Sequence, residues 1–345
     1  MIRVAAFTSS LNDPSSRFRM RQLFEPLRQL GIEAEEFRPW ISKFAPASLQ
    51  LTGLGLLSRA CSSVAARKHD VAWLNREFVT GFETMERFAG KRRLLDVDDA
   101  IWLEGKGPGR SDFARRIAGR CQGVIAGNEC IAEYFRRSTE RVWIVPTAVD
   151  TQRWTPGERF QTSGGRTLQT CTIGWSGTAW NLAYLYGIEG ALVRFLDGHQ
   201  HATLLVVSDR PPRFQALQAS RFEFQRWTPE TEVAALRRMD VGIMPLPDDE
   251  WTRAKCAMKM LCYMAVGLPV VVSPVGVAQE ILGRGNVGLA ASNAGEWVEA
   301  LAALYQDRER AAAMGREGRS VVEQHYSVQG AASQLASIFT EVASQ

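Results

Sequence analysis

Short apolar runs alternate with helical patterns along nearly the whole chain. Runs such as IRVAAF, DVAWLN and GVIAGN are rich in apolar and β-branched residues, whereas stretches such as RMRQLFEPLRQLG space their apolar residues three or four positions apart. Strand and helix signals in alternation are typical of parallel sheets whose crossovers are helices. The pattern therefore predicts an α/β protein, with ligand sites where the strands end.

One segment interrupts this alternation. AVDTQRWTPGERFQTSGGRT is rich in Gly, Pro, Ser and Thr and predicts a linker over residues 150–167. We expect a first domain over residues 1–155 and a second over residues 166–327, since a chain of 345 residues exceeds one core. A closing helix over residues 328–345 keeps its apolar side chains on one side and could pack back on the first domain.

Composition narrows the class of protein. With 41 basic and 37 acidic residues, the net charge of +4 excludes a protein that binds nucleic acid through a dominant basic face. The six cysteines lack metal-ligand spacing, and we read them as reduced core thiols of a cytosolic protein. The start MIRVAAFTSS predicts a first strand and not a signal peptide.

The most apolar early segment is LQLTGLGLLSRACSSVAA. Gly53, Gly55 and Arg59 interrupt it, so it is too short to span a membrane. A leucine-rich surface or packing helix fits better, and the segment from Leu49 to Leu57 with Arg59 offers a peripheral contact with a membrane surface.

The stretch LCYMAVGLPVVVSPVG, residues 261–276, predicts a tight helix-to-strand turn inside an α/β domain. Arg253, Lys255 and Lys259 precede it, and the two lysines, four positions apart, are expected on one helical face. Because the following turns are wholly apolar, we expect a buried helix with a basic mouth for an anionic ligand, in preference to a solvated surface helix.

A second candidate lies in CTIGWSGTAWNLAYL. Gly174 and Gly177 would let the backbone turn sharply, and Thr178 would cap a long helix from about Ala179 to Leu196. Free N–H groups at the start of that helix favour a diphosphate, although an ordinary strand-to-helix turn explains the glycines equally well.

Charged residues also follow two strands of the first domain. LLDVDDAIW places Asp96, Asp98 and Asp99 at a strand end, where carboxylates can bind a metal, act as a base, accept hydrogen bonds from hydroxyls or cap a turn. Arg17 and Arg19 follow the first strand, where they either contact a substrate or are ordinary solvated charges.

Assembled, these segments resemble the GT-B glycosyltransferases, specifically the large retaining family 4 (glycosyl transferases group 1). Four segments carry the match, which thins in the first domain. They are WIVPTAVDTQRW, RRMDVGIMPL, YMAVGLPVVVSPVGVAQEIL, which includes Gly267, Pro269 and Glu280, and HYSVQGAASQLASIF. The resemblance implies two Rossmann-like domains whose parallel sheets face across a cleft, with a nucleotide-sugar donor on the C-terminal domain and the acceptor on the N-terminal one.

The chain departs from that family at two places. Ala254 and Cys262 stand where the family usually carries a pair of glutamates, and the interval from Pro245 to Gly267 is longer than usual, so Asp249 or Glu250 could replace the first carboxylate. The family's Arg and Lys after the first donor-domain strand are also missing. A leaving diphosphate needs positive charge, and we therefore expect the basic cluster before the turn to supply it.

The prediction is a glycosyltransferase, retaining by resemblance, that transfers a sugar from a UDP-, GDP- or ADP-sugar to a glycan, glycolipid or small-molecule hydroxyl. Alternatives are a non-catalytic nucleotide-sugar-binding homologue and a sugar-nucleotide epimerase. No metal or further cofactor is expected, and polysaccharide assembly in the cytoplasm, at the inner membrane surface, is the expected setting. The candidate residues are Asp98, Asp99 and Lys255 for catalysis, Arg17 and Arg19 for the acceptor, and Gly174, Gly177, Thr178, Asp249, Glu250, Arg253, Lys255, Lys259 and Gly276 for the donor.

Overall fold

The structure is a computed structural model that describes all residues except 43–44, 46, 51, 105–111 and 158–169. It divides into two compact units. The first comprises residues 1–148, 253–256 and 328–345, and the second comprises residues 149–252 and 257–327. The first continuous stretch of the first unit ends at Ala148, seven residues before the expected boundary at 155. Residues 158–167 of the expected linker, and the expected start of the second domain at 166, lie outside the described residues.

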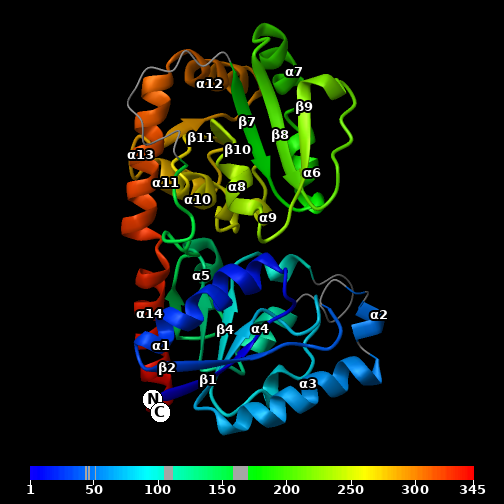
Figure 1. Cartoon of the computed structure of the whole chain (residues 1–345). Coiled ribbons are helices and arrows are strands. Elements are labelled where there is room, and N and C mark those ends of the chain that lie inside the picture. Colours follow the sequence, from blue (N-terminus) through cyan, green and yellow to red (C-terminus); the bar gives the residue numbers. More distant parts are fainter. Residues whose placement is uncertain (43–44, 46, 51, 105–111, 158–169) are drawn as a thin grey trace. The chain divides into compact units, whose positions relative to one another are not determined.

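The first unit is built on a parallel sheet of six strands in the order β2-β1-β3-β4-β5-β6 (Figure 1). Because β1 lies between β2 and β3, the chain changes direction across the sheet at β1, and ligands of such folds bind at the carboxyl ends of the strands beside this point. The strands are β1 (Ile2–Phe7), β2 (Ile32–Phe37), β3 (Val71–Asn75), β4 (Arg93–Val97), β5 (Gly123–Ala126) and β6 (Val142–Ile144).

The core on one face of this sheet joins residues from both ends of the chain. Alternate strand residues such as Val4 and Trp73 pack against α1 (Phe24–Gln29) and α14 (Val328–Ala343), which lies beside α1 and β1 (Figure 1). The rings of Trp73 and Phe339 meet edge to face with centroids 5.3 Å apart. The closing helix therefore covers the first sheet.

The segment RMRQLFEPLRQLG is helical as expected, but it belongs to three consecutive helical segments of different type. Ser16–Met20 is wound as a π-helix and Arg21–Leu23 as a 3-10 helix before α1 begins at Phe24. Pro26 has no N–H to donate to the fourth residue before it, so an uninterrupted α-helical ladder cannot run through this point. The remaining helical segments of the first unit are α2 (Ala47–Gln50), α3 (Gly53–Ala65), η3 (Ala66–Lys68), η4 (Glu86–Phe88), η5 (Ile101–Leu103), α4 (Phe113–Ala118) and α5 (Glu129–Arg136).

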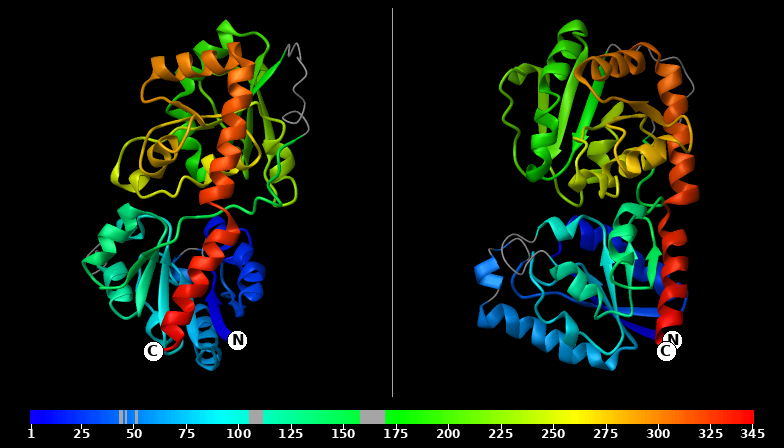
Figure 2. Two further views of the ribbon diagram at one scale, coloured as in Figure 1. Left: turned by 90° about the vertical axis from the view of Figure 1, so that its left-hand side faces the viewer. Right: turned by 180° about the vertical axis from the view of Figure 1, so that it is seen from behind.

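The second unit has its own parallel sheet of six strands, in the order β12-β11-β10-β7-β8-β9. The strand order reverses between β7 and β10, and helices flank both faces of the sheet (Figure 2). The strands are β7 (Cys171–Ser176), β8 (Ala202–Ser208), β9 (Phe222–Arg226), β10 (Val241–Met244), β11 (Val270–Val272) and β12 (Gly288–Ala290). Two six-strand parallel sheets confirm the predicted α/β class.

The long helix expected from Ala179 to Leu196 is divided into η7 (Ala179–Asn181), α6 (Leu182–Tyr186) and α7 (Glu189–Gly198). Gly187, which has a low helix propensity, ends α6. The other helical segments of the unit are η8 (Ala219–Arg221), α8 (Glu232–Leu236), α9 (Glu250–Arg253), α10 (Met258–Ala265), α11 (Val277–Leu282), α12 (Ala294–Gln306) and α13 (Arg308–His325).

The helix-to-strand turn predicted at residues 261–276 is confirmed. α10 ends at Ala265, Gly267 takes a positive φ of 81°, and the three residues of β11 are fully buried. A side chain at Gly315 of α13 would lie 2.0 Å from the carbonyl oxygen of Gly267, so a glycine is needed on both sides of this contact.

Two further expectations can be compared with the structure. No helix in the described part of the chain is both long and apolar enough to cross a membrane. All six cysteines are free, but only Cys171, Cys256 and Cys262 are buried. The interpretation of the cysteines as core thiols is therefore wrong for Cys61, which is exposed, and for Cys121 and Cys130, which are partly exposed.

Candidate active-site residues on the two units

An ion cluster marks the carboxyl edge of the first sheet. Arg76 directly follows β3 and has a φ of 60°, a left-handed conformation that few residues other than glycine adopt. Its Nε lies 2.6 Å from Oδ1 of Asp98 and one terminal nitrogen lies 2.5 Å from Oδ2 of Asp99. The backbone strain therefore aims a guanidinium at both carboxylates that follow β4.

This pairing fixes the protonation state of Asp98. Burial alone would raise the pKa of the carboxyl, but the charge and hydrogen bond of Arg76 outweigh it and lower the pKa to about 2. Asp98 therefore stays ionised at neutral pH. It can accept a hydrogen bond from a substrate hydroxyl, but it is a weak general base. In the described part of the chain, no three His, Cys, Asp or Glu side chains are grouped to hold a metal.

Lys255 belongs to this cluster of the first unit. Its Nζ lies 3.5 Å from Oδ1 of Asp99, and the neighbouring Cys256 thiol donates to the carbonyl oxygen of Asp98 at 3.3 Å. A side chain on Gly127 would lie 2.4 Å from the Cys256 sulfur, so that glycine makes room for the segment 253–256. Lys255 is thus a partner of a carboxylate, a contact that the sequence did not predict.

The expectation that Lys255 and Lys259 share a helical face is wrong. α9 ends at Arg253, residues 254–257 are not helical, and Ala257 has a φ of 49° before α10 begins at Met258. A residue in the left-handed conformation interrupts a right-handed helix, so the two lysines stand on separate segments. The predicted basic helix is therefore two short helices joined by a bend.

Arg19 is buried in an ion pair and is not one of the solvated charges that the sequence also allowed. Its side chain is 3% exposed, and its Nε lies 2.8 Å from Oδ1 of Asp96. Trp73 donates to the other oxygen of Asp96 at 2.9 Å. Arg19 also donates to the carbonyl oxygen of Val145 at 2.6 Å, so it joins three segments inside the unit. Arg17 is partly buried, with its guanidinium 5.2 Å from the ring centroid of Phe18.

A hydroxyl network that sequence reasoning missed lies between the loop after β1 and the end of β3. Asp13 accepts hydrogen bonds from the Ser9 hydroxyl and from the N–H and hydroxyl of Ser16. Ser16 donates to the Asn75 side chain at 3.0 Å, and Asn75 donates to Ser15 at 2.8 Å. The signal was present, because TSSLNDPSS is a polar run directly after a buried strand.

In the second unit, Gly174 proves to be a packing residue. It lies within β7, and a side chain there would meet the sulfur of Met239 at 2.0 Å. The prediction that Gly174 forms a sharp turn is therefore wrong. Gly242 in β10 is similar, since its missing side chain leaves room for the ring of Tyr263.

Gly177 and Lys259 meet at the carboxyl end of β7. A side chain on Gly177 would lie 2.5 Å from Cε of Lys259 and 2.8 Å from the ring of Trp175. The Lys259 ammonium lies 5.6 Å from the centroid of that ring, within the range of a cation–π contact. The absent side chain of Gly177 thus lets a cation reach the turn beside the reversal of strand order.

Most backbone N–H groups of this turn already have partners. The Ser176 N–H donates to the Tyr263 hydroxyl at 2.7 Å and the Gly177 N–H donates to the Val207 carbonyl oxygen at 3.0 Å. The Ala179 N–H donates to a carboxylate oxygen of Asp209 at 2.7 Å. The expected row of free N–H groups for a diphosphate is therefore not formed, and Tyr263 and Asp209 are functional neighbours that the sequence did not indicate.

Thr178 does not cap the following helix through its side chain. Its hydroxyl oxygen accepts a hydrogen bond from the Asn181 side chain at 3.0 Å, and no bond runs from that hydroxyl to a backbone N–H of the helix. Asp249 is the residue that caps a helix, since its Oδ1 accepts from the Thr252 N–H at 2.8 Å in α9. Asp249 is solvent-exposed.

The other donor candidates lie at two places in the sequence. Glu250 and Arg253 are the first and last residues of α9, and both are exposed. Gly276 precedes α11 with φ 53° and ψ −131°, a conformation that essentially only glycine adopts.

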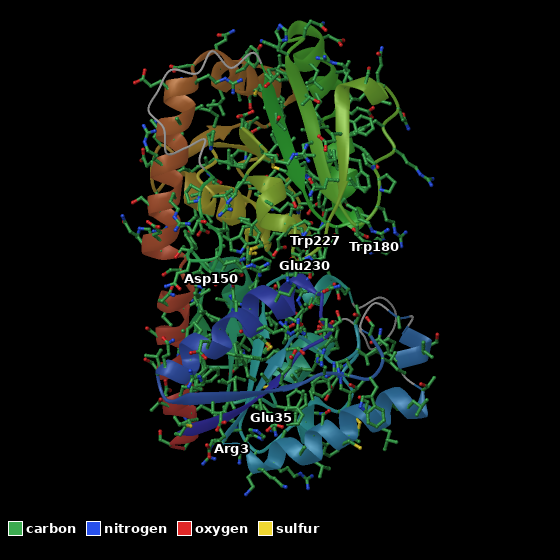
Figure 3. All side chains as sticks on the ribbon, viewed as in Figure 1. Arg3, Glu35, Asp150, Trp180, Trp227 and Glu230 are labelled. Carbon is green, nitrogen blue, oxygen red and sulfur yellow. The ribbon has the colours of Figure 1, made fainter. Side chains whose placement is uncertain are left out.

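An exposed tryptophan stands at the same end of the second unit. The Trp180 side chain, in η7 directly after the turn, is 88% exposed, and Figure 3 labels it and Trp227 at the end where β7 and β8 terminate. Trp227 differs, because its indole N–H donates to Glu232 at 3.1 Å. A large exposed aromatic at a strand end is suited to stacking on a ligand.

The comparisons with known proteins concern the family and the fold of the chain. Residues 172–307, less than half of the chain, match the model of the family described as glycosyl transferases group 1. The sequence matches none of the curated proteins.

Several solved structures share the fold over almost the whole chain. Sucrose-phosphate synthase from Thermosynechococcus elongatus superposes with a TM-score of 0.75 at 14% identity, covering 99% of each chain. HepE from Anabaena, in complex with UDP and glucose, has a TM-score of 0.70 at 13% identity over 99% of this chain and 100% of that one. WaaG, a glycosyltransferase involved in lipopolysaccharide biosynthesis, has a TM-score of 0.68 at 14% identity over 98% and 99%. Residues 172–307 thus match the model of glycosyl transferases group 1, and the chain as a whole shares the GT-B fold of these structures.

Proposed function

We propose that the protein is a glycosyltransferase that uses a nucleotide sugar and binds its diphosphate on the second unit at Gly177 and Lys259. The observation that carries the proposal is the position of the Lys259 ammonium at the turn after β7, within the segment that matches the glycosyltransferase family. A diphosphate leaving group gains negative charge as the glycosidic bond breaks, and a fixed cation at that point stabilises the transition state.

UDP is the nucleotide that we propose first. Solved structures of HepE hold UDP or UDP-glucose, and their fold covers this whole chain. Trp180 is the residue of the second unit best placed to add contacts with the nucleotide. Its side chain is exposed, and it lies two residues beyond Thr178, directly after the turn. GDP- and ADP-sugars remain in the test as competitors.

The acceptor hydroxyl is proposed to bind Asp98 on the first unit. Arg76 keeps this carboxylate ionised with a pKa of about 2, so it orients the hydroxyl without removing its proton. The departing phosphate oxygen is then the group that takes the proton, which is the arrangement of a front-face, retaining transfer. Lys255 is a positioning residue in this scheme, because it holds Asp99 beside Arg76.

The donor proposal is tested by calorimetry with UDP, GDP and ADP and their sugars. Lys259→Met should weaken binding of the preferred nucleotide at least about tenfold, equal to about 1.4 kcal/mol, because the methylenes remain and the charge is lost. Lys68→Met, at an exposed lysine of the first unit, is the matched control. Unchanged affinity in Lys259→Met would refute the placement of the diphosphate.

Turnover separates transfer from its alternatives. Ala254 and Cys262 replace the usual glutamate pair, and this observation favours the non-catalytic homologue as the second candidate. Mass spectrometry of each nucleotide sugar with a panel of glycan acceptors should reveal a glycosylated product, and NMR should show retained anomeric configuration. Tight nucleotide binding without product would support the binding protein, whereas conversion of the donor sugar without acceptor would reveal an epimerase.

A contact with the inner membrane surface is proposed on α3, in keeping with a lipid-linked acceptor in polysaccharide biosynthesis. Leu54, Leu57 and Val64 of this helix are 65%, 51% and 61% exposed, and apolar side chains gathered on one helix are suited to a membrane surface. Arg59, which was expected to lie exposed beside these side chains, is buried and adds no exposed charge to the apolar surface of the helix. Val64→Asp should abolish cosedimentation with phosphatidylglycerol vesicles, whereas Thr340→Asp, at an exposed position of α14, should preserve it; equal binding by both would refute the contact.

A further inference from the structure

A buried arginine in the first unit has no acidic partner. Arg59 of α3 is 5% exposed, and its Nε is shielded from solvent without a hydrogen-bond partner. Both terminal nitrogens reach only the carbonyl oxygen of Thr8, each at 3.4 Å. In the part of the chain that the structure describes, no carboxylate lies within ion-pair distance of this guanidinium, which makes it a charge without compensation.

The carboxylate of Glu86 acts on Arg59 through its charge, without an ion pair. Glu86 is 2% exposed, and its oxygens accept hydrogen bonds from the N–H groups of Phe78 at 2.7 Å and Thr84 at 2.6 Å. Arg59 instead stacks its guanidinium 4.4 Å from the ring centroid of Phe78. Burial consequently lowers the pKa of Arg59 to about 10, partly offset by Glu86. A guanidinium held in this way favours binding of an anion that can accept hydrogen bonds from its N–H groups.

The contrast with Arg19 shows that the unit can neutralise a buried arginine. Arg19 is equally buried but forms an ion pair with Asp96 at 2.8 Å. A buried charge without a partner lowers the stability of the folded state. The presence of Arg59 is therefore better explained by a function than by stability. Such groups are frequent where a ligand supplies the missing partner.

Arg59 also lies where a ligand is expected. Thr8 directly follows β1 and Phe78 lies three residues beyond the end of β3, so both stand at the carboxyl edge beside the change in strand direction. Ser10, two residues beyond Thr8, has a hydroxyl oxygen that is likewise shielded and without a partner. Two unsatisfied polar groups therefore come from the segments that border this edge.

We propose that Arg59 binds an anionic group, a phosphate or a carboxylate, on the acceptor substrate. The inference rests on the proposed function and specifies its acceptor class. The planar fork of the guanidinium matches both groups in a bidentate manner, with Nε and one terminal nitrogen as donors. Since Arg59 is only 5% exposed, the anion reaches it when the loop of residues 8–16 moves, and binding should slow hydrogen exchange in that loop.

Binding is tested on the full chain with inorganic phosphate as the probe, at constant ionic strength with chloride as reference. Arg59→Met should raise the melting temperature of the ligand-free protein, because an uncompensated buried charge is replaced by an apolar chain of similar length. It should also abolish the slowing of hydrogen exchange by phosphate in residues 8–16. Arg67→Met, at an exposed arginine just beyond the same helix, should change neither result.

Phosphate can also bind to the proposed diphosphate site of the second unit, and Lys259→Met distinguishes that binding from binding at Arg59. This variant should leave the slowing of hydrogen exchange in residues 8–16 intact. If Arg59 has a structural role instead, Arg59→Met lowers the melting temperature and the phosphate response of the loop persists; that pair of results would overturn the proposal. Arg59→Lys, which keeps the charge but not the fork, should fold normally and weaken the response at least about fivefold, equal to about 1 kcal/mol.

Two kinds of acceptor can carry the anion, and a second pair of measurements distinguishes them. If it belongs to a soluble sugar phosphate, Arg59→Met should reduce kcat/KM for the phosphorylated acceptor at least about tenfold relative to its unphosphorylated form, with KM for the nucleotide sugar unchanged. If it belongs to a lipid, Arg59→Met should lose binding to phosphatidylglycerol vesicles relative to phosphatidylcholine. The exchange experiment does not need turnover, so a protein that fails to transfer sugar can still confirm or refute the anion site.

Discussion

Replacing Arg76 by methionine isolates the charge that organises the carboxyl edge of the first sheet. The substitution retains much of the side-chain length and removes the guanidinium that pairs with Asp98 and Asp99. Because the Arg76 side chain is 10% exposed and the two carboxylates are 13% and 20% exposed, solvent screens these interactions only in part. The substitution should therefore lower the stability of the first unit.

The magnitude follows from the protonation of Asp98. Its pKa falls from 3.8 to about 2 on folding, with burial opposing the shift and Arg76 driving it. Each pKa unit corresponds to about 1.4 kcal/mol, so the ionised carboxylate stabilises the folded state by about 2.5 kcal/mol at neutral pH. Because the folded pKa is the lower one, this contribution is present above pH 3.8 and is lost as the pH falls through about 2.

Urea denaturation of wild type and Arg76→Met at several pH values measures this difference. We expect a gap of at least about 2.5 kcal/mol in the free energy of unfolding at pH 7, because burial raises the pKa of Asp98 once Arg76 is gone, and the gap should shrink as the pH approaches 2. Arg67→Met serves as the control for loss of an exposed arginine. A gap that stays constant with pH, or a variant as stable as wild type at pH 7, would refute the reasoning.

Three further predictions concern packing and reactivity. Phe339→Ala, at a fully buried ring of α14, should cost about 3–5 kcal/mol in unfolding free energy, whereas Thr340→Ala beside it, at an exposed position, should cost less than about 1 kcal/mol. Gly174→Ala should lower the melting temperature, because its new methyl group would overlap the Met239 side chain in the folded state; an unchanged melting temperature would show that Met239 can move aside. A thiol reagent in native buffer should label the exposed Cys61 first and Cys256 only on unfolding, since burial raises the pKa of the Cys256 thiol to about 12; rapid labelling of Cys256 would contradict its placement.

Local patterns predicted the architecture well because they report on burial. The run VVV after Gly267 and Pro269 is apolar on both sides, which only a strand covered by helices on both faces requires, and it became the fully buried β11. The closing helix over residues 328–345 was likewise indicated by one apolar side and is observed at Val328–Ala343. Such patterns are local in the chain, and no partner needs to be known to read them.

The site was predicted less well because its partners are distant in sequence. Lys255 pairs with Asp99 across 156 positions, and Arg19 pairs with Asp96 across 77. Spacing of charges within one segment cannot reveal such pairs, and it suggested a helical face for Lys255 and Lys259 that the left-handed Ala257 prevents. The sequence around Arg59 predicts an exposed leucine-rich segment. The neighbouring leucines do not indicate that the Arg59 side chain turns inward to Thr8.

The covering of β1 by α14 has a consequence for how the protein is made. The strand leaves the ribosome before the second unit is made, whereas α14 follows only after the second unit has been synthesised. Until then, the part of the apolar face that α14 covers is open to chaperones or to aggregation. Ribosome-bound chains halted before residue 328 should accordingly be cleaved by protease in the first unit and spared in the second.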